Sequence, residues 1–368
     1  MNQKKTYYSL GLMSGSSLDG LDIAWSKMTW ELDRISDWEL LSAETLPYSQ
    51  MWRERLESLP IQSAEIYAKT DVYFSYYMAE LVQTFMKKNG CNQIDFVASH
   101  GHTVFHDPDR RFTSQIGNGG SLAAILEQTV ISDFRVQDLA HSGEGAPLAI
   151  AADKYLFDGF DFFVNIGGIA NISYLNPKSM IAFDFAAANQ PLNRIAQEMG
   201  LEYDNRGIIA SQGNLLPELL EKLSYLDFHQ KKYPKSMSNQ WIQKVFIPIL
   251  LEHNASQPDK LHTLVHYIAE QLARALEQIK ESVRILPLSP KILFSGGGVH
   301  HNFLMEVIKE KLKNQYETVI PDKEIINFKE ALLMSVLGIL RWEEQVNAFS
   351  SVTGAKKSSC NGAIYFAK

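Results

Sequence analysis

Apolar runs separated by glycine-containing turns divide the chain into short strands. Two runs within 10–25 flank a turn of glycine and serine and predict a hairpin, and 163–174 repeats that outline. Residues 34–46 and 179–183 predict further strands, and 291–295 predicts a buried strand that leads into a glycine turn. Bounded apolar runs of this length are typical of strands. Both halves of the chain therefore contain a run of predicted strands.

Apolar residues at helical spacing follow each run of strands. Over 63–88, residues such as Ile66, Met78 and Phe85 fall largely on one face, and a similar pattern covers 261–283. Residues three and four apart share a helix face, so this spacing predicts amphipathic helices. Further helices are predicted over 121–127, 191–199, 215–226, 301–313 and 330–344, and short strands over 96–100 and 130–134. The alternation of strands and helices predicts an α/β fold.

The length of the chain suits two lobes. One hydrophobic core rarely grows beyond about 250–300 residues, and this chain has 368. The two similar hairpins indicate that both lobes follow one plan. We expect a first lobe formed by 1–138 with 347–368 and a second lobe formed by 139–346, the C-terminal tail returning to the first lobe. We expect the active site in the cleft between the lobes.

Three glycine-containing turns carry the functional prediction. One follows Ser14, the second is Gly167–Gly168, and the third is 296–298. Glycine reaches positive φ and lets backbone N–H groups approach an anion closely, which is how a turn binds phosphate. Two such turns facing each other, with a third for the nucleoside, are the arrangement of two-lobed ATPases of the actin, sugar-kinase and chaperone type. The order and spacing of the turns therefore predict ATP as a ligand.

The first turn offers hydroxyl and backbone donors and two carboxylates. Its predicted ATP-binding residues are Ser14, Gly15, Ser16, Ser17, Leu18, Asp19, Gly20, Leu21 and Asp22. Asp19 and Asp22 are also candidates for holding Mg²⁺ through its waters, the usual way this ion is kept beside a triphosphate. The alternative is an ordinary β-turn in which aspartate and serine only form the turn.

The second and third turns have structural alternatives as well. The residues predicted to complete the ATP site are Gly167, Gly168, Gly296, Gly297, Gly298 and Asn302. The triple glycine precedes a predicted helix, whose start offers free N–H groups to an anion. In the alternative, Asn165 and Asn171 satisfy turn backbone, and the triple glycine serves tight strand–helix packing.

Several polar residues are candidates for contacts with a second substrate. His100, His102 and His106 lie on a predicted strand-to-loop segment without cysteine or a second ligand cluster. That setting favours substrate contacts or packed polar groups over zinc. Asp133 and Arg135 follow a strand, either as a ligand-facing carboxylate–guanidinium pair or as a structural ion pair.

Asp184 follows the apolar strand 180–183 and so lies at the carboxyl end of a strand, where α/β proteins bind ligands. A carboxylate there can act as a general base if it reaches a water or a hydroxyl. In the alternative, Asp184 or Asn189 only caps the helix over 191–199.

Composition narrows the class of partner. The net charge of −7 argues against nucleic acid or a membrane surface, and 45% hydrophobic with 21% charged residues is typical of soluble globular proteins. No apolar run reaches the length of a membrane span, and the first six residues lead into a strand pattern rather than a signal-peptide core. Cys91 and Cys360 cannot form a disulfide framework or a metal cluster. We expect a cytoplasmic protein.

The sequence resembles the anhydro-N-acetylmuramic acid kinases over essentially its whole length. The resemblance rests on a series of motifs in one order. These are 13–22, 99–106, 115–117, 133–138, 143–148, 165–172, Phe183–Asp184, Tyr203–Asp204, 234–236, 296–302, Glu330–Ala331 and 352–355.

The resemblance implies a kinase of cell-wall (peptidoglycan) recycling. Members of the family use ATP and Mg²⁺ to open the 1,6-anhydro ring of anhydro-N-acetylmuramic acid with water, giving N-acetylmuramic acid 6-phosphate. By match, Asp184 would be the base that activates water, and the three glycine turns would bind ATP. The residues expected to contact the amino sugar are His100, His102, Asp133, Arg135 and Asn189. The resemblance also implies a homodimer.

Two departures from the family's pattern bear on the substrate. The family commonly continues its catalytic aspartate as Thr-Gly-Pro-Gly-Asn, whereas this chain has Phe-Ala-Ala-Ala-Asn, and Phe185 is expected to narrow the cavity. Asn239 stands where the family has an arginine, which can bind a carboxylate or phosphate with two parallel hydrogen bonds. Two alternatives therefore stay open. One is a kinase of a different amino sugar on the same fold, and the other is a nucleotide-binding chaperone-like or regulatory protein that has lost phosphoryl transfer.

Overall fold

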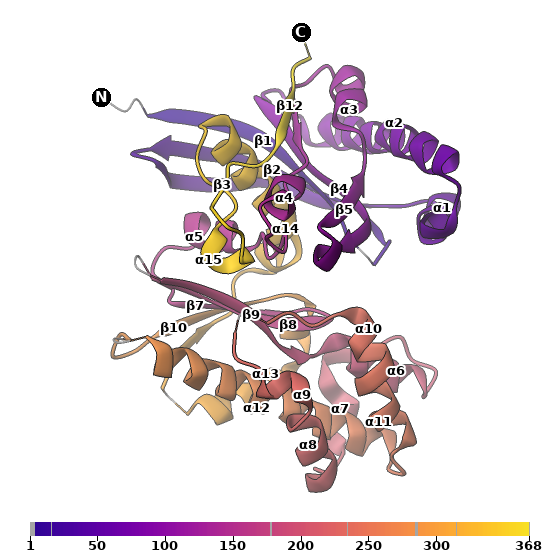
Figure 1. Ribbon diagram of the computed structural model, residues 1–368, viewed down its shortest axis with the longest axis vertical. Coiled ribbons are helices and arrows are strands. Elements are labelled where there is room, and N and C mark those ends of the chain that lie inside the picture. Colours follow the sequence, from indigo (N-terminus) through magenta and orange to yellow (C-terminus); the bar gives the residue numbers. More distant parts are fainter. Residues whose placement is uncertain are drawn as a thin grey trace. The chain divides into compact units, whose positions relative to one another are not determined.

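The computed structural model describes residues 4–367 except 16, 177–178, 234, 284–285 and 314. The chain divides into two compact units (Figure 1). Unit 1 consists of Met1–Asp158 together with Phe328–Lys368, and unit 2 is Gly159–Asn327. Each unit has a sheet and a hydrophobic core of its own.

Within the residues that the structure describes, seven strands form the sheet of unit 1. An antiparallel meander consists of β1 (Lys5–Ser14), β2 (Gly20–Glu31) and β3 (Arg34–Pro47). On the other side of β1, β4 (Phe96–Asp107) and β6 (Val130–Ser132) continue the sheet in parallel. β12 (Ala363–Tyr365) pairs antiparallel with β6, and β5 (Phe112–Ile116) pairs antiparallel with β4. The strand order is β12-β6-β4-β1-β2-β3.

Helices cover both faces of this sheet. Leu10 of β1 lies in one core with Phe74 and Met78 of α2, whereas a Cβ at the next residue, Gly11, would overlap the carbonyl oxygen of Ala331 in α14. Neighbouring residues of a strand point to opposite faces, so α2 and α14 pack on opposite sides. The helices are α1 (Gln50–Ser58), α2 (Ala64–Asn89), α3 (Gly119–Leu126), α4 (Val136–Ala140), α5 (Ile150–Leu156), α15 (Ser350–Thr353) and α14 (Lys323–Trp342), which enters unit 1 at Phe328.

Unit 2 repeats the central part of this plan. β7 (Phe162–Ile166), β8 (Ile169–Asn176) and β9 (Ser179–Ala187) form an antiparallel meander, and β10 (Lys291–Ser295) and β11 (Glu317–Val319) continue in parallel from β7. The order β11-β10-β7-β8-β9 corresponds to β6-β4-β1-β2-β3 of unit 1, strand for strand and direction for direction. The two units therefore share one strand order.

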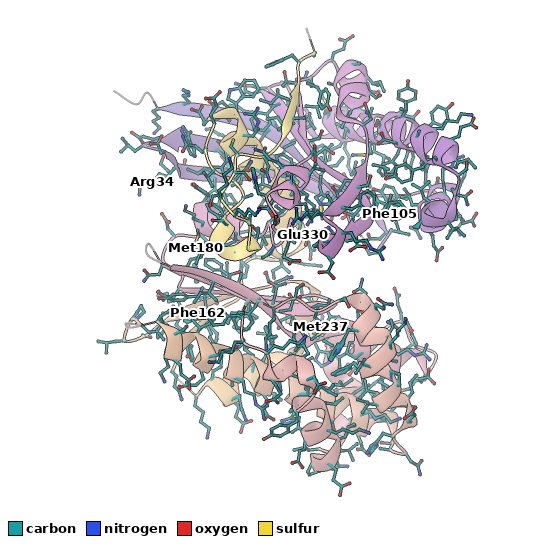
Figure 2. The ribbon with its side chains drawn as sticks, in the orientation of Figure 1. Arg34, Phe105, Phe162, Met180, Met237 and Glu330 are labelled. Atoms are coloured by element: carbon teal, nitrogen blue, oxygen red, sulfur yellow. The ribbon has the colours of Figure 1, made fainter. Side chains whose placement is uncertain are left out.

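A long helix, α12 (Gln257–Ser282), forms the largest helical part of the core of unit 2. Leu264, Ile268 and Leu272 of α12 are fully buried in one cluster with the β7 residues Phe162 and Val164. Phe162 is labelled in Figure 2. The other helices are α6 (Asn189–Gln197), α7 (Ile208–Gln212), α8 (Pro217–Ser224), α9 (Asp227–Gln230), α10 (Asn239–Trp241), α11 (Ile247–Glu252) and α13 (Asn302–Leu312). A five-residue π-helix, Ile242–Phe246, joins α10 to α11.

The boundaries of the units differ from the sequence-based prediction. Residues 139–158 and 328–346 were expected in the second lobe and belong to unit 1. A buried ion pair between Lys329 Nζ and Asp153 Oδ1, 2.5 Å long, ties these two stretches to each other. Contacts between residues this far apart in the chain leave no mark in local composition.

The predicted elements themselves are largely present. Both hairpins, the strand over 34–46 and the helix over 63–88 are confirmed as β1–β2, β7–β8, β3 and α2. β4 is longer than expected and runs to Asp107, and α1, α10 and α11 were not predicted. Within the ranges that the structure describes, no helix has both the length and the apolar character that a membrane span needs.

Candidate active site

The turn between β1 and β2 is shaped by its own side chains. Asp19 Oδ1 accepts hydrogen bonds from Ser17 Oγ at 2.5 Å and from the N–H of Gly20 at 3.1 Å. Leu18 has a φ of 57°, a left-handed conformation that is uncommon outside glycine. Asp19 thus forms the turn with one oxygen, and no hydrogen bond of the described residues uses its other oxygen. Ser16, also predicted to bind ATP, lies outside the described residues.

The rest of the hairpin divides into an accessible and a buried part. Gly15, Ser17 and Leu18 are partly or fully exposed, whereas Gly20 and Leu21 are buried, Leu21 in the core. A Cβ at Gly20 would overlap the carbonyl oxygen of Leu46, so this glycine is required for strand packing. The exposed part of the turn is where a ligand can reach the chain.

The hydroxyl of Ser14 is bound inside unit 1. It accepts a hydrogen bond from Tyr48 Oη at 2.7 Å and lies 3.1 Å from His102 Nδ1. Ser14 and His102 are both buried, and burial lowers the pKa of His102 to about 4. Neutral His102 therefore belongs to a buried chain of polar groups beneath the end of β1, and the backbone of Ser14 is what remains for a ligand.

Asp22 is a half-buried carboxylate near the start of β2. It accepts a hydrogen bond from Thr45 Oγ1 at 2.5 Å on the neighbouring strand. Burial raises the pKa of Asp22 to about 6; the hydrogen bond from Thr45 opposes this shift, and the charges of Asp19 and Glu330 add to it. Among the described residues no ion pair neutralises Asp22. A carboxylate surrounded by negative charge is suited to binding a cation.

All three histidines of the 99–106 motif lie on β4 rather than on a strand-to-loop segment. His100 Nε2 accepts from Arg135 Nε at 2.9 Å, so its Nδ1 carries the proton toward the Gly101 carbonyl, 3.0 Å away. Burial, and secondarily the charge of Arg135, lowers the pKa of His100 to about 3. His106 Nδ1 lies 3.1 Å from Thr113 Oγ1. The described residues contain no group of three potential metal ligands among histidine, cysteine, aspartate and glutamate.

Asp133 and Arg135 have separate partners. Asp133, at a φ of 63°, accepts a hydrogen bond from the N–H of Val136, and no ion pair between Asp133 and Arg135 is found in the described residues. Arg135 donates through Nη1 to the Gly145 carbonyl at 2.8 Å and through Nε to His100. The interpretation as a structural ion pair is therefore wrong for the described structure. Exposed Asp133 and the half-buried guanidinium remain available to a ligand.

The second and third glycine turns meet in unit 2. A Cβ at Gly298 would overlap the side chain of Ile166, and one at Gly296 would overlap Asn165 Oδ1. Gly296 also has a φ of 83°. Tight packing therefore requires glycine at both positions. Gly297 is different, because the nearest neighbour of its Cβ would be Asn189 Nδ2 at 3.8 Å, which leaves room.

Asn189 joins these turns without capping a helix through its side chain. Its Nδ2 donates to the Ile166 carbonyl at 3.2 Å, and its backbone N–H donates to the Gly167 carbonyl at 3.0 Å. The N-cap of α6 is Ala188, which has no side-chain cap, and its N–H donates to the Gly168 carbonyl at 3.0 Å. Neither Asp184 nor Asn189 therefore serves as the predicted cap.

The segment after the triple glycine departs from the expected helix start. Gly297–His300 forms a 3₁₀ turn, and α13 begins only at exposed Asn302. His301 caps α13, since its Nδ1 accepts from the N–H of Leu304 at 3.1 Å. The helix start therefore already has a partner for one of its N–H groups.

Asp184 lies within β9 and not at the carboxyl end of a strand as predicted, because the strand continues past it to Ala187. It belongs to a row of polar residues that crosses the sheet of unit 2. Asn165 of β7, Asn171 of β8 and Asp184 of β9 are direct partners in the strand register. Directly opposite residues share a face of the sheet, so the three side chains lie on one face, and all are half-buried. The row places two neutral amides beside one carboxylate.

Two donors hold the carboxylate of Asp184. Ser236 Oγ donates to Oδ2 at 3.1 Å, and the N–H of Met237 donates to the same oxygen at 2.7 Å. Burial raises the pKa of Asp184, and these two hydrogen bonds lower it. No hydrogen bond of the described residues uses Oδ1. The two hydrogen bonds to Oδ2 hold the carboxylate in one orientation, so Asp184 can accept a proton at Oδ1.

Sequence reasoning gave no role to three residues of these sites. Ser236 stands 52 positions from Asp184, although it lies inside a motif of the resemblance. Buried Asp138 accepts from the N–H of Gly145 and from Thr353 Oγ1, both at 2.8 Å, and so joins three motifs structurally. The charge of Glu330 acts on Asp22 and on Arg135. The motif series was the available signal for all three.

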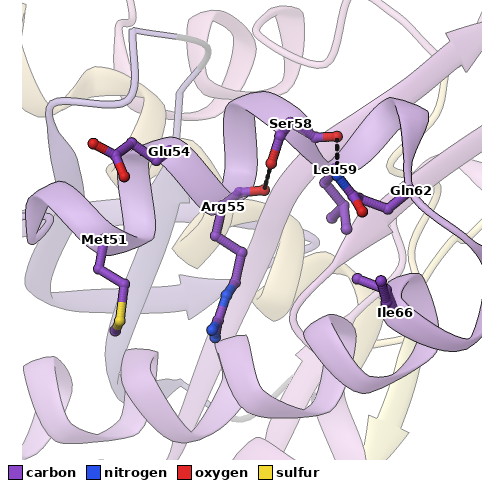
Figure 3. A pocket seen from close by; sticks show the side chains of 7 residues that line it. All are labelled: Met51, Glu54, Arg55, Ser58, Leu59, Gln62 and Ile66. Atoms are coloured by element: carbon purple, nitrogen blue, oxygen red, sulfur yellow. Dashed lines mark hydrogen bonds between the residues drawn. The ribbon is translucent and has the colours of Figure 1, made fainter.

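An open pocket of about 310 Å³ lies elsewhere on unit 1 (Figure 3). It is lined by Met51, Glu54, Arg55, Ser58, Leu59, Gln62 and Ile66. Ser58 Oγ donates to the Arg55 carbonyl at 3.3 Å, and Gln62 Nε2 donates to the Ser58 carbonyl at 3.4 Å. None of the predicted site residues lines this pocket.

Fold and site together define a class: a two-unit α/β protein whose sheets share one strand order, with a glycine-containing turn at the first hairpin of each. The sequence model of the anhydro-N-acetylmuramic acid kinase family matches residues 7–367. The chain therefore belongs to the anhydro-N-acetylmuramic acid kinase family.

Curated relatives match along nearly their whole length. The anhydro-N-acetylmuramic acid kinase of Haemophilus influenzae is 32% identical over 391 residues, with 99% of each chain covered. That of Francisella tularensis subsp. novicida is 30% identical, with 98% of each chain covered. That of Pseudomonas syringae pv. tomato is 31% identical, with 98% of this chain and 99% of the relative covered.

Proposed function

We propose that this protein is an ATP-dependent kinase that opens the 1,6-anhydro ring of anhydro-N-acetylmuramic acid with water. The product is N-acetylmuramic acid 6-phosphate, formed in peptidoglycan recycling. Family membership over residues 7–367 supports this activity. The single observation that carries the chemistry is the Asp184 carboxylate, whose Oδ2 is held by two donors while Oδ1 has no hydrogen bond among the described residues.

Asp184 is the proposed general base. The oxygen of a water molecule forms a bond to the anomeric carbon as the bond from that carbon to the bridging oxygen breaks. Asp184 accepts the proton that the water loses, and the freed oxygen takes the γ-phosphoryl group of ATP, leaving ADP. Burial raises the pKa of Asp184, opposed by the bonds from Met237 and Ser236, so this carboxylate is a stronger base than a free one.

ATP is assigned to the three glycine turns. In unit 1 the proposed contacts are the backbone of Ser14, the exposed part of the turn, and the carboxylates of Asp19 and Asp22. In unit 2 they are Gly167–Gly168, the triple glycine and Asn302. The room beside Gly15 and Gly297 supports the assignment, because a Cβ there would meet no neighbour nearer than 3.5 Å and 3.8 Å respectively. Backbone N–H groups at such positions can approach a phosphate closely.

Asp19 and Asp22 are the residues proposed to hold Mg²⁺. Their chemistry fits this hard cation, which prefers oxygen ligands and keeps several of its waters. Each has a carboxylate oxygen without a hydrogen bond among the described residues, and the charge of Asp19 raises the pKa of Asp22. When bound, Mg²⁺ neutralises charge on the transferred phosphoryl group.

The amino sugar is assigned to His100, His102, Asp133, Arg135 and Asn189. Both ring nitrogens of His100 already have partners, so we propose that it acts by orienting Arg135. The guanidinium donates to protein through Nε and Nη1. Its remaining Nη2 suits the carboxylate of the sugar's lactyl group, as a charge-assisted donor.

A kinase that acts on a different amino sugar is the second candidate function. Two residues, Phe185 and Asn239, favoured it in the sequence, and the structure removes the argument from Phe185. Phe185 is 2% exposed and lies in the core of unit 2, so it does not narrow an open site as expected. Asn239 still supports this candidate, because its Oδ1 accepts from Gln190 Nε2 at 2.8 Å and presents no positive charge. Turnover of anhydro-N-acetylmuramic acid beside an anhydro amino sugar without the lactyl group separates the two.

A homodimer in the cytoplasm is proposed on the family resemblance. The net charge of −7 supports small-molecule partners rather than nucleic acid. Light scattering of the purified chain tests the dimer, and fractionation of the source cells tests the location.

ADP release with ATP, Mg²⁺ and 1,6-anhydro-N-acetylmuramic acid tests the main proposal. We expect sugar-dependent turnover in the wild type and a loss of about 10²–10⁴-fold in Asp184→Asn, the usual worth of a general base. Asp227→Asn, at the exposed start of α9, is the matched control and should retain turnover. A wild type that binds ATP and releases no ADP with the sugar contradicts the proposal.

A further inference from the structure

A three-residue segment, Lys235-Ser236-Met237, runs beside β9 and brackets Asp184. The N–H of Asp184 donates to the Lys235 carbonyl at 3.1 Å. Two residues further along, the N–H of Met237 donates back to Asp184 Oδ2, and Ser236 Oγ donates to the same oxygen. Three hydrogen bonds thus link the backbone and the carboxylate of Asp184 to this segment.

The segment is anchored on both sides of Ser236. The Met237 side chain is 4% exposed and belongs to the core of unit 2 (Figure 2). The Lys235 ammonium lies over the ring of Phe228 at 5.0 Å and over that of Phe183 at 5.7 Å. Ser236 lies between these anchors and is itself exposed. Its hydroxyl is therefore held near Asp184 by its neighbours rather than by burial of its own side chain.

The hydrogen bonds distinguish the two oxygens of Asp184. Both hydrogen bonds to the Asp184 carboxylate fall on Oδ2, and none of the described residues donates to Oδ1. An oxygen that accepts two donors is a poorer proton acceptor than one that accepts none. The strand beyond Asp184 is irregular too, because the register of β8 and β9 shifts between Ala170 and Asn171, which leaves Phe185 as an extra residue. Such bulges redirect side chains beside functional sites.

We propose that Ser236 is a positioning residue for Asp184. Its O–H and the N–H of Met237 occupy Oδ2 and leave Oδ1 as the oxygen that takes the proton of the attacking water. The inference rests on the proposed function and deepens it. The role of Ser236 differs from that of a residue that touches substrate, because it acts through the carboxylate.

The other charged and titratable groups around Asp184 do not mask the effect of the Ser236 hydrogen bond on its carboxylate. β8 presents the neutral Asn171, and Lys235 lies over aromatic rings. His229 is neutral, because burial and then the charge of Lys235 lower its pKa to about 3; from α12, buried Tyr267 Oη lies 2.9 Å from His229 Nε2. Among the described residues the shift of the Asp184 pKa arises from burial and the two donors alone. Removing the Ser236 donor therefore removes one of the three causes that set the pKa of Asp184.

The test compares the pH dependence of kcat in Ser236→Ala, Ser236→Thr and Ser238→Ala. Ser236→Ala removes a bond that favours the ionised carboxylate, so the pKa of Asp184 rises and the acid limb of kcat moves to higher pH. At pH 7 we expect kcat to fall about five- to tenfold, the worth of one hydrogen bond, with KM little changed. Ser236→Thr retains the hydroxyl and should restore the wild-type limb. Ser238→Ala, which loses a bond to the Trp241 N–H at 3.1 Å instead, should leave the limb in place.

A second readout separates this inference from the proposed function. The carbon signal of the Asp184 carboxyl, assigned with Asp184→Asn, titrates in the free protein and needs no turnover. We expect its midpoint to rise in Ser236→Ala and to return in Ser236→Thr. If the wild type shows no sugar-dependent turnover, the proposed function fails while this titration still decides whether Ser236 controls Asp184. An unchanged midpoint in a folded Ser236→Ala overturns the inference.

Discussion

The two units share a strand order and differ most where their first hairpins turn. In unit 1, five residues (15–19) separate β1 from β2, and Asp19 and Ser17 bond to each other within that turn. In unit 2, Gly167–Gly168 alone separate β7 from β8, and both carbonyls accept from the start of α6. One turn carries its own polar side chains, and the other supports the next helix.

The row of residues beside each turn sharpens this contrast. In unit 1 the row is Met13, Asp22 and Thr45, and in unit 2 it is Asn165, Asn171 and Asp184. The carboxylate is on the middle strand in unit 1 and on the third strand in unit 2. Asp22 is bonded to its row neighbour, whereas Asp184 is bonded to a segment more than fifty residues away.

This difference shows how one scaffold supports two kinds of carboxylate. On the middle strand Asp22 has a strand on each side, and its additional electrostatic neighbours are other carboxylates, which suits a cation. On the third strand Asp184 is open to a segment of the chain that arrives from outside the meander, which supplies oriented donors. The sheet provides the position, and the connections around it provide the chemistry.

The largest effect is expected from breaking the ion pair that joins the two chain segments of unit 1. Asp153 is 3% and Lys329 8% exposed, and their charged atoms are 2.5 Å apart. Lys329→Met leaves a buried carboxylate without its cation, so we expect a loss of about 3–5 kcal/mol in the free energy of unfolding. Urea denaturation followed by circular dichroism measures the loss.

The control for this change is a surface pair of the same unit. Lys69 and Glu65 are paired on the exposed face of α2, so Lys69→Met should cost no more than about 0.5 kcal/mol. Equal losses in the two variants would show that the long-range pair does not hold the segments of unit 1 together.

The glycine turns of the two units should respond differently to alanine. A Cβ at Gly298 in unit 2 would overlap Ile166 Cγ2 and lie 3.0 Å from the Ile166 carbonyl oxygen, whereas one at Gly15 in unit 1 has no neighbour nearer than 3.5 Å. Overpacking predicts a loss of about 2–3 kcal/mol for Gly298→Ala, and Gly15→Ala should cost less than about 1 kcal/mol. Thermal unfolding of both variants checks this. If Gly298→Ala is as stable as Gly15→Ala, tight packing is not the reason why the third turn has glycine at this position.

The smallest effect concerns the carboxylate of unit 1. The folded pKa of Asp22, about 6, lies above its unfolded value of 3.8, so its charge costs stability as pH rises from about 4 to about 6. Asp22→Asn removes that cost while keeping an oxygen to accept from Thr45. In ligand-free protein we expect a gain of about 1 kcal/mol above pH 6, discounted for partial solvation, and no gain below pH 4. Melting temperatures across this pH range are the measurement.

Asp37→Asn, at an exposed position of β3, is the matched control. It removes a negative charge from the same unit and leaves the row of Met13, Asp22 and Thr45 unchanged. A gain for Asp22→Asn that is the same at pH 4 and pH 7.5 would contradict the assignment of that gain to the buried charge.

Much of the fold was predictable from local pattern. The period of apolar residues in 63–88 predicts α2 because a helix of that length buries one face. Glycine between two apolar runs predicts both hairpins. Asp184 was identified as a candidate base because the strand was expected to end at 183, whereas β9 runs to Ala187 and Asp184 lies within it. The unit boundaries were not predictable, because Asp153 and Lys329 pair across a stretch of chain that belongs mostly to the other unit.

By itself the sequence determined the elements, the repeated hairpin and the family, since local spacing and motif order are properties of the chain in one dimension. Only the tertiary structure decided that Ser236 donates a hydrogen bond to Asp184, that Arg135 donates one to His100, and that Phe185 is buried in a core. The physical reason is that the directions of side chains and of hydrogen bonds are set by the folded sheet. Which oxygen is bonded and which face a residue occupies depend on strand register, a bulge and distant partners, and these exist only once the sheet has formed.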